Sequence, residues 1–133
     1  MTSTPWSSST AWSCAVPVFG PKGRRGTGFS SIVPANVAGV RHYVQQIGRG
    51  LIGVRARDGK FLWGYNRIAS QTANIPTPVV IGDRVFCANG YNAGAALVKL
   101  VAAPGGGLAV REEFFLRARE FQNHHGGFVH VDG

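Results

Sequence analysis

The chain alternates short hydrophobic runs with breaks rich in glycine, proline and asparagine, and the runs have the two-residue period of β-strands. The clearest run is Val40–Ile47, which is rich in β-branched and aromatic residues. Because successive side chains of a strand point to opposite faces, one face of this run carries Val40, His42, Val44 and Gln46. The pattern predicts an all-β fold of short strands joined by tight turns.

The same order of strands, turns and breaks occurs twice. The first unit is predicted to hold strands at Ser31–Val33, Val40–Ile47, Leu51–Ala56 and Lys60–Tyr65. The second unit is predicted to hold strands at Ile75–Ile81, Arg84–Ala88, Ala95–Leu100 and Leu108–Leu116. Asp58–Gly59 predicts a tight hairpin in the first unit, since glycine supplies the positive φ that such turns need. The second unit has a loop of alanine, proline and glycine at that place.

Short motifs repeat at a nearly constant spacing. Ser31–Val33 aligns with Pro78–Val80 and then with Gly127–Val129, at offsets of 47 and 49 residues. Trp12 and Trp63 are 51 residues apart, and Phe114 or Phe115 lies near the next equivalent position. Four short strands in a repeat of about 40–50 residues are typical of β-propellers. The sequence predicts antiparallel four-stranded blades, about two and a half of them, in an incomplete propeller; a single sandwich or small barrel is the alternative.

This interpretation divides the chain into five parts. They are a tail (1–11), the end of a preceding blade with a basic loop (12–28), a blade (29–72), a blade (73–121) and the first strand of a further blade (122–133). Open blade faces and strand edges invite association. The isolated chain is therefore expected to oligomerise or aggregate.

Composition and charge narrow the choice of fold and partner. Of 133 residues, 19 are glycine, 44% are hydrophobic and 15% are charged, which argues against both disorder and a helical bundle. The net charge of +8 comes from basic residues that are mostly scattered singly, Arg24–Arg25 being the one adjacent pair. A nucleic-acid patch usually has a run of basic residues. A basic nucleic-acid-binding domain is therefore disfavoured and kept only as a third interpretation.

Cysteine and hydropathy patterns exclude several further classes. Cys14 and Cys87 are far apart and form no zinc or thioredoxin-like motif; two buried free thiols are expected, and a disulfide stays open. No apolar run reaches the length of about 18 residues that a membrane span needs. The first thirteen residues lack the basic start and apolar stretch of a signal peptide. The compartment is not determined by these features.

The segment GRGLIGVRARDGKFLW, residues 48–63, combines a glycine, an apolar strand, an Asp-Gly-Lys turn and an aliphatic residue before tryptophan. This pattern resembles the repeat of the pyrroloquinoline-quinone-type, or quinoprotein-like, β-propellers. Arg55 stands where that family often has aspartate before the turn. Flanking segments such as SSIVPANVAGVRHYVQQ, residues 30–46, resemble the bacterial branch of these repeat proteins, and the similarity covers residues 12–133.

The resemblance implies a set of structural and functional expectations. Trp12 and Trp63 would dock their blade against its neighbour, and other blades of a full-length propeller would be the principal partners. A periplasmic or other extracytoplasmic location is also implied. Ligands of propellers bind at the mouth of the central channel. Polar residues recur in the loops expected there: Ser30, Asn74, Thr77, Asn123, His124 and His125.

The histidine pair has the most versatile chemistry of these residues, because imidazole can act as base, donor or metal ligand. Adjacent residues of a strand point to opposite faces, however, so His124 and His125 are poorly placed to bind one metal ion. No metal ligands are predicted. A polar channel lining or a structural hydrogen-bonding role is the preferred interpretation for all six residues.

Dehydrogenases of the resembled family have a calcium site, a catalytic carboxylate and a disulfide between adjacent cysteines. The chain has no Cys-Cys pair, and no catalytic residues are predicted. No cofactor is expected for the preferred function, which is a binding or scaffolding module for a protein or a small polar ligand. The alternative is part of a quinoprotein oxidoreductase, like an alcohol or sugar dehydrogenase. Its catalytic residues would lie outside this chain, and it would use pyrroloquinoline quinone and calcium.

Overall fold

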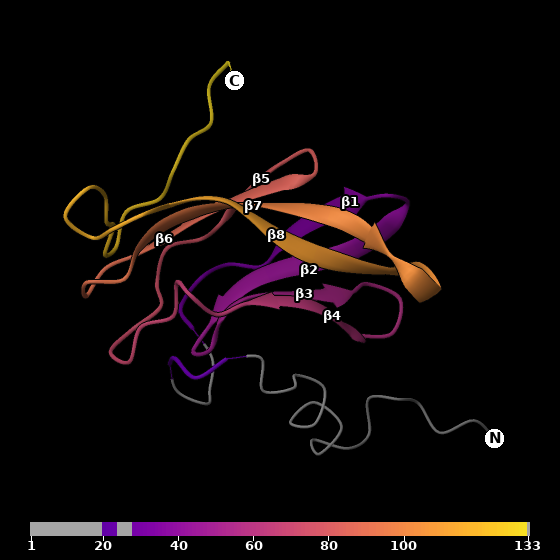
Figure 1. The fold of residues 1–133 in the computed structure, drawn as a ribbon, viewed down its shortest axis with the longest axis horizontal. Coiled ribbons are helices and arrows are strands. Elements are labelled where there is room, and N and C mark those ends of the chain that lie inside the picture. The colour runs from indigo at the N-terminus through magenta and orange to yellow at the C-terminus, as the bar shows by residue number, and fades with distance from the viewer. Residues whose placement is uncertain (1–19, 24–27, 133) are drawn as a thin grey trace.

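Two four-stranded antiparallel sheets make up the computed structural model, which describes residues 20–23 and 28–132 (Figure 1). The first sheet contains β1 (Val33–Val37), β2 (Val40–Ile47), β3 (Gly50–Arg55) and β4 (Phe61–Tyr65). The second contains β5 (Val79–Ile81), β6 (Arg84–Asn89), β7 (Gly94–Ala103) and β8 (Gly107–Leu116), with the one-turn 3₁₀ helix η1 (Pro104–Gly106) between the last two. Each strand pairs with its neighbours in sequence, so both sheets are meanders.

The predicted all-β class and the two groups of four strands are confirmed, and β2 has the predicted bounds. Gly59 has a φ of 72°, as the predicted turn between β3 and β4 requires. The segment 122–132, expected as the first strand of a further blade, contains no strand; a strand needs a neighbouring backbone to pair with, and no ladder reaches this segment. Trp12, Cys14 and the predicted tail lie outside the described residues.

The two sheets repeat one another in register. Gly50 begins β3 with a φ of 114°, and Gly94 begins β7 with a φ of 95°. A side chain at Gly50 would collide with the carbonyl oxygen of Tyr65, and one at Gly94 with that of Leu116. The turn after the last strand repeats too, because Ala69 N donates to Asn66 O as Glu120 N donates to Arg117 O. Equivalent positions in the two sheets can therefore be assigned from these shared features.

The sheets pack face to face with equivalent strands adjacent. β4 contacts β8, and β1 contacts β5 and β7 (Figure 1). We call the two faces that meet the inner faces and the two that point away the outer faces. The core lies between the inner faces. Its buried members are Ala35, Val37, Val44, Leu51, Trp63, Tyr65, Ile68, Val85, Cys87, Ala96, Val98, Leu100 and Leu108.

Trp63 is the largest side chain of this core and is only 3% exposed. Its indole lies across the backbone of Gly53, its partner on β3; a Cβ at Gly53 would collide with the ring. The row continues through Val44, which is completely buried. The ring of His42 meets Trp63 edge-on, with 6.2 Å between centroids. Glycine at position 53 thus makes room for the tryptophan predicted to dock the two sheets.

A polar contact joins the sheets where β4 lies against β8. Glu112 accepts a hydrogen bond of 2.5 Å from the hydroxyl of Tyr65 and one of 2.8 Å from Arg67. The Arg67 guanidinium also lies over the ring of Phe115, 3.8 Å from its centroid. Burial, followed by the bond to Glu112, raises the pKa of Tyr65, so the phenol stays protonated and remains a donor. Glu112, which lies within the strand predicted at Leu108–Leu116, is therefore an inter-sheet contact.

Arg55 replaces the aspartate expected before the turn and makes a different turn contact. Its Nε donates to Asp58 Oδ1 at 2.9 Å, and its Nη2 donates to Oδ2 at 2.5 Å. Asp58 Oδ1 also accepts from the backbone N of Lys60. The paired guanidinium holds the pKa of Asp58 well below its usual range. An ion pair between the end of β3 and the turn thus stabilises the hairpin that joins β3 to β4.

Replacing Trp63 with alanine should lower the free energy of unfolding by about 3–5 kcal/mol, because the truncation empties a site between the sheets. Chemical denaturation of both proteins measures this difference. Trp63→Phe keeps an aromatic ring over Gly53 and should lose clearly less, about 1–2 kcal/mol. An alanine variant as stable as the parent would show that this side chain does not hold the sheets together.

Stability should fall as the pH drops below about 6.5, because of His42. The side chain is fully buried, and burial lowers its pKa more than its hydrogen bond to Val40 O raises it. The unfolded chain takes up a proton near pH 6.5 while the folded chain does not, so acid favours unfolding by up to about 1.4 kcal/mol per pH unit. Thermal melts of the parent between about pH 7.5 and pH 5 should show the decline as a falling melting temperature.

His42→Gln should flatten the pH dependence even if it lowers stability throughout. His125→Gln is the matched control, since His125 is exposed, and it should retain the decline of the parent. An unchanged slope in the His42 variant would assign the pH dependence to other groups.

Candidate functional site

Ser30 is the first of the predicted channel-mouth residues, and it is buried at 8% exposure. Its hydroxyl donates to Gln46 O at 3.1 Å and accepts from Gln46 N at 3.0 Å, which extends the β2 backbone pairing by one side chain. The Gln46 side chain in turn donates to Ala88 O of the second sheet, at 3.2 Å. Ser30 is therefore part of a buried contact that reaches from one sheet to the other.

Asn74 occupies the centre of the same region and is 4% exposed. Its Oδ1 accepts from Ser70 N at 2.9 Å and from Asn89 Nδ2 at 2.7 Å, and its Nδ2 donates to Ser70 O at 3.0 Å. Its backbone oxygen accepts from Phe29 N at 2.8 Å. One asparagine thus ties the connection between the sheets to β6 and to the loop before β1. The hydrogen-bonding capacity of this side chain is used within the protein.

Thr77 lies close to these two residues, since its hydroxyl accepts from Ser31 N at 2.9 Å. The structure therefore brings three of the six predicted residues, Ser30, Asn74 and Thr77, together. Their arrangement is that of a structural network, because each of the three is hydrogen-bonded to another part of the chain. Within the described residues, Ser30, Asn74 and Thr77 form a hydrogen-bonded contact between two loops, which we call the polar seam.

Of the other three predicted residues, His124 lies against the turn between β6 and β7. Nε2 of His124 accepts from Tyr91 N at 3.2 Å, and the two rings meet edge-on at 4.9 Å. His124 also covers Gly90, where a side chain would collide with the imidazole. His125 is exposed, with its ring 6.3 Å from that of His124. Asn123 is half-buried, and its Oδ1 has no hydrogen-bond partner among the described residues.

Sequence reasoning missed two members of the polar network, Gln46 and Asn89, and one further buried polar side chain, His42. Gln46 and His42 were assigned correctly to one face of the strand, but not recognised as fully buried groups. Asn89 directly follows the strand predicted at Arg84–Ala88; its amide also donates to Ile68 O at 3.3 Å, and its Oδ1 accepts from Gly90 N. The available sequence signal was that His42 and Gln46 share a strand face with two valines. Only the position of the second sheet shows that the Gln46 amide reaches Ala88 O.

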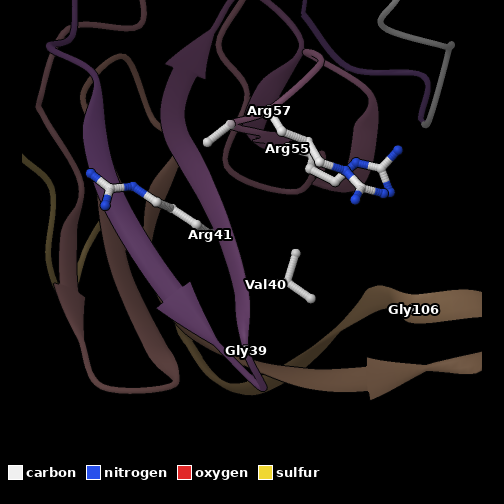
Figure 2. Close-up of a pocket in the computed structure, with 7 residues that line it drawn as sticks. Gly39, Val40, Arg41, Arg55, Arg57 and Gly106 are labelled. Carbon is white, nitrogen blue, oxygen red and sulfur yellow. The ribbon is translucent and has the colours of Figure 1, made fainter.

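A pocket of about 480 Å³ lies at the opposite end of the sheets, where the strands turn (Figure 2). It is lined by Gly39, Val40, Arg41, Arg55, Ala56, Arg57 and Gly106. Arg55 and Arg57 extend to the same side, whereas Arg41 points away from them (Figure 2). The charge of Arg55 is paired with Asp58. The pocket could accept an acidic group beside Arg57, but its three arginines do not converge on one point.

Other reactive groups are held inert by burial. Cys87 is a free thiol in the core, and burial raises its pKa to about 12, so the nucleophilic thiolate is not formed at neutral pH. This confirms the expected buried thiol at Cys87. Among residues 20–23 and 28–132 no three histidine, cysteine or acidic side chains are grouped so that they could hold a metal ion.

The described part of the chain has no helix that is long and apolar enough to cross a membrane. No protein-family model, curated protein or solved structure gives a significant match to the chain. The contacts within the molecule are therefore the basis on which a function can be proposed.

Replacing Asn74 with alanine should lower the free energy of unfolding by about 3 kcal/mol, since it removes three side-chain hydrogen bonds and leaves buried partners unsatisfied. Urea denaturation tests this. His125→Ala, at an exposed position, should change stability by less than about 0.5 kcal/mol. Equal stability of both variants would instead favour a ligand-binding role for Asn74.

Proposed function

We propose that the chain is a blade-forming repeat of a quinoprotein-like β-propeller, and that it acts as a binding or scaffolding module without catalysis of its own. The observation that supports this most is the register of the two sheets. The inner row of the first sheet is Val33, Val44, Gly53 and Trp63. The equivalent row of the second sheet is Val79, Phe86, Leu97 and Phe114, and it lies on the outer face.

In a repeat of this kind every sheet has one face that packs on the sheet before it and one that packs on the sheet after it. The same contact can therefore recur from one sheet to the next. The inner row of the first sheet is covered by the second sheet. The equivalent row of the second sheet is also apolar, yet Phe114 is 42% exposed. A sheet that is apolar on both faces is suited to a position between two neighbours. Other blades are accordingly the first partners of the proposed module.

The ends of the sheets are where such a module would bind other molecules. Loops at the end of a rigid sheet commonly carry function, because the strands fix their positions. One end here holds the buried polar seam around Asn74, and the other holds the pocket beside Arg57. Arg57 and Arg41 are exposed cations, so the pocket end favours an acidic group of a protein or small polar ligand.

Joining two copies of the chain in one polypeptide tests the stacking proposal. The joint should link His124 of the first copy to Gly28 of the second, because Leu116 and the next Val33 are then separated by thirteen residues, as Tyr65 and Val79 are. The fusion should unfold in one cooperative melt, at least about 5 °C above that of the dilute single chain. Calorimetry of dilute samples of both proteins measures the difference.

The matched control carries Phe114→Asp in the first copy only, which places a charge in the new junction. This control should lose most of the gain in melting temperature. Two halves that unfold independently at the melting temperature of the single chain would contradict stacking. Oxidation of an alcohol or sugar, detected with a redox dye after adding pyrroloquinoline quinone and calcium, would contradict a module without catalysis.

A further inference from the structure

The outer face of the second sheet carries a patch of apolar side chains that the chain covers only in part. The patch consists of Val79, Phe86, Leu97 and Phe114, together with Phe121 and Phe128 from the segment after β8. Phe86 meets Phe121 and Phe128 edge-on, at centroid distances of 6.0 and 5.1 Å. Phe114 and Phe121 remain 42% and 37% exposed. Exposed aromatic clusters of this kind mark interaction surfaces.

The outer face of the first sheet is equivalent, in the repeat, to the inner face of the second sheet. Its row Pro34, Tyr43 and Val54 is equivalent in register to Val80, Val85 and Val98. In the second sheet that row lies on the inner face and packs on the first sheet. Tyr43 is 38% exposed in the chain as it stands. Each of the two outer faces is therefore equivalent to one of the two inner faces that meet between the sheets.

The segment that follows β8 leaves the ring of Phe114 accessible to solvent. The turn at Arg117–Glu120 repeats the turn at Asn66–Ala69, so the segment starts along the path of the connection between the sheets. It then lies against the β6–β7 turn through Gln122 and His124, at the margin of the patch. Phe114 is not covered by this path, as its exposure shows.

We propose that the outer face of β5–β8 binds the outer face of β1–β4 of a second copy of this chain, head to tail. The contact continues the internal sheet-on-sheet interface, with Phe114 and Tyr43 near its centre. It rests on the proposed stacking of blades, but assigns the next blade to another molecule. Because the two faces differ, the association is heterologous and yields a closed ring or an open stack, according to the rotation between sheets.

Sedimentation velocity of the unmodified chain over a range of concentrations tests for association. It should be carried out near physiological salt, where repulsion between molecules of net charge +8 is screened. The mass should rise above the 14.1 kDa of a single chain in whole multiples. Phe114→Asp and Tyr43→Asp should each weaken association about a hundredfold, because each buries an unpaired carboxylate in the interface. Phe29→Asp is the control, at a 76% exposed aromatic outside both rows, and should associate like the parent.

Mixing the two interface variants tests the head-to-tail geometry. The Phe114→Asp chain keeps an intact β1–β4 face, and the Tyr43→Asp chain keeps an intact β5–β8 face. Each variant alone should be a monomer, while the mixture should form a complex of one chain of each, with no larger species. Circular dichroism of the separate variants should match the parent, which establishes that both are folded.

A monomeric parent at high concentration would overturn the proposal. Dimers of Tyr43→Asp alone would also overturn it, since they require contact between two identical faces. If separate chains stay monomeric while the joined copies are stabilised, stacking of blades stands and the second-copy assignment fails. If the joined copies also show no stabilisation, both fail.

Discussion

The packing of one sheet face on another is the interaction on which the rest of this structure depends. In the described part of the chain neither four-stranded meander has a second layer of its own, so the apolar side chains of each inner face are removed from water by the other sheet. Trp63 shows how closely the two are fitted. Its ring occupies space that Gly53 leaves free, and it meets the second sheet from the middle of the interface. A change in either residue alters the distance at which the sheets can pack.

Polar contacts then fix how the sheets are aligned. Hydrophobic contact is non-directional, whereas a buried hydrogen bond fails unless its partner is in place. The amides of Gln46, Asn74 and Asn89 each reach a partner in a different part of the chain at one end of the stack. The bond between Tyr65 and Glu112 serves the same purpose where β4 meets β8. The candidate site and the alignment of the sheets are thus one set of interactions.

The sequence predicts part of the repeat and part of the assignment of side chains to the two faces of each strand. Alternation along Val40–Ile47 assigned His42, Val44 and Gln46 to one face, and the structure adds that this face is the buried one. The spacing of Trp63 and Phe114 also marked equivalent positions, which pairing with Gly53 and Leu97 now establishes. The strand predicted at residues 122–133 could not be decided in this way. Local propensity favours it, but strand formation requires a paired neighbour.

The sequence by itself determined the class of fold, the order of the eight strands and the positions where the chain turns. These follow from local rules: a two-residue period for strands, and glycine where φ is positive, as at Gly59. Only the tertiary structure decided which polar residues are buried and which are accessible. Ser30 and Asn74 had the same sequence signature as His125, yet two are hydrogen-bonded inside the seam and one is exposed. Burial depends on the second sheet, whose contacts come from residues more than forty positions away, as between Gln46 and Ala88.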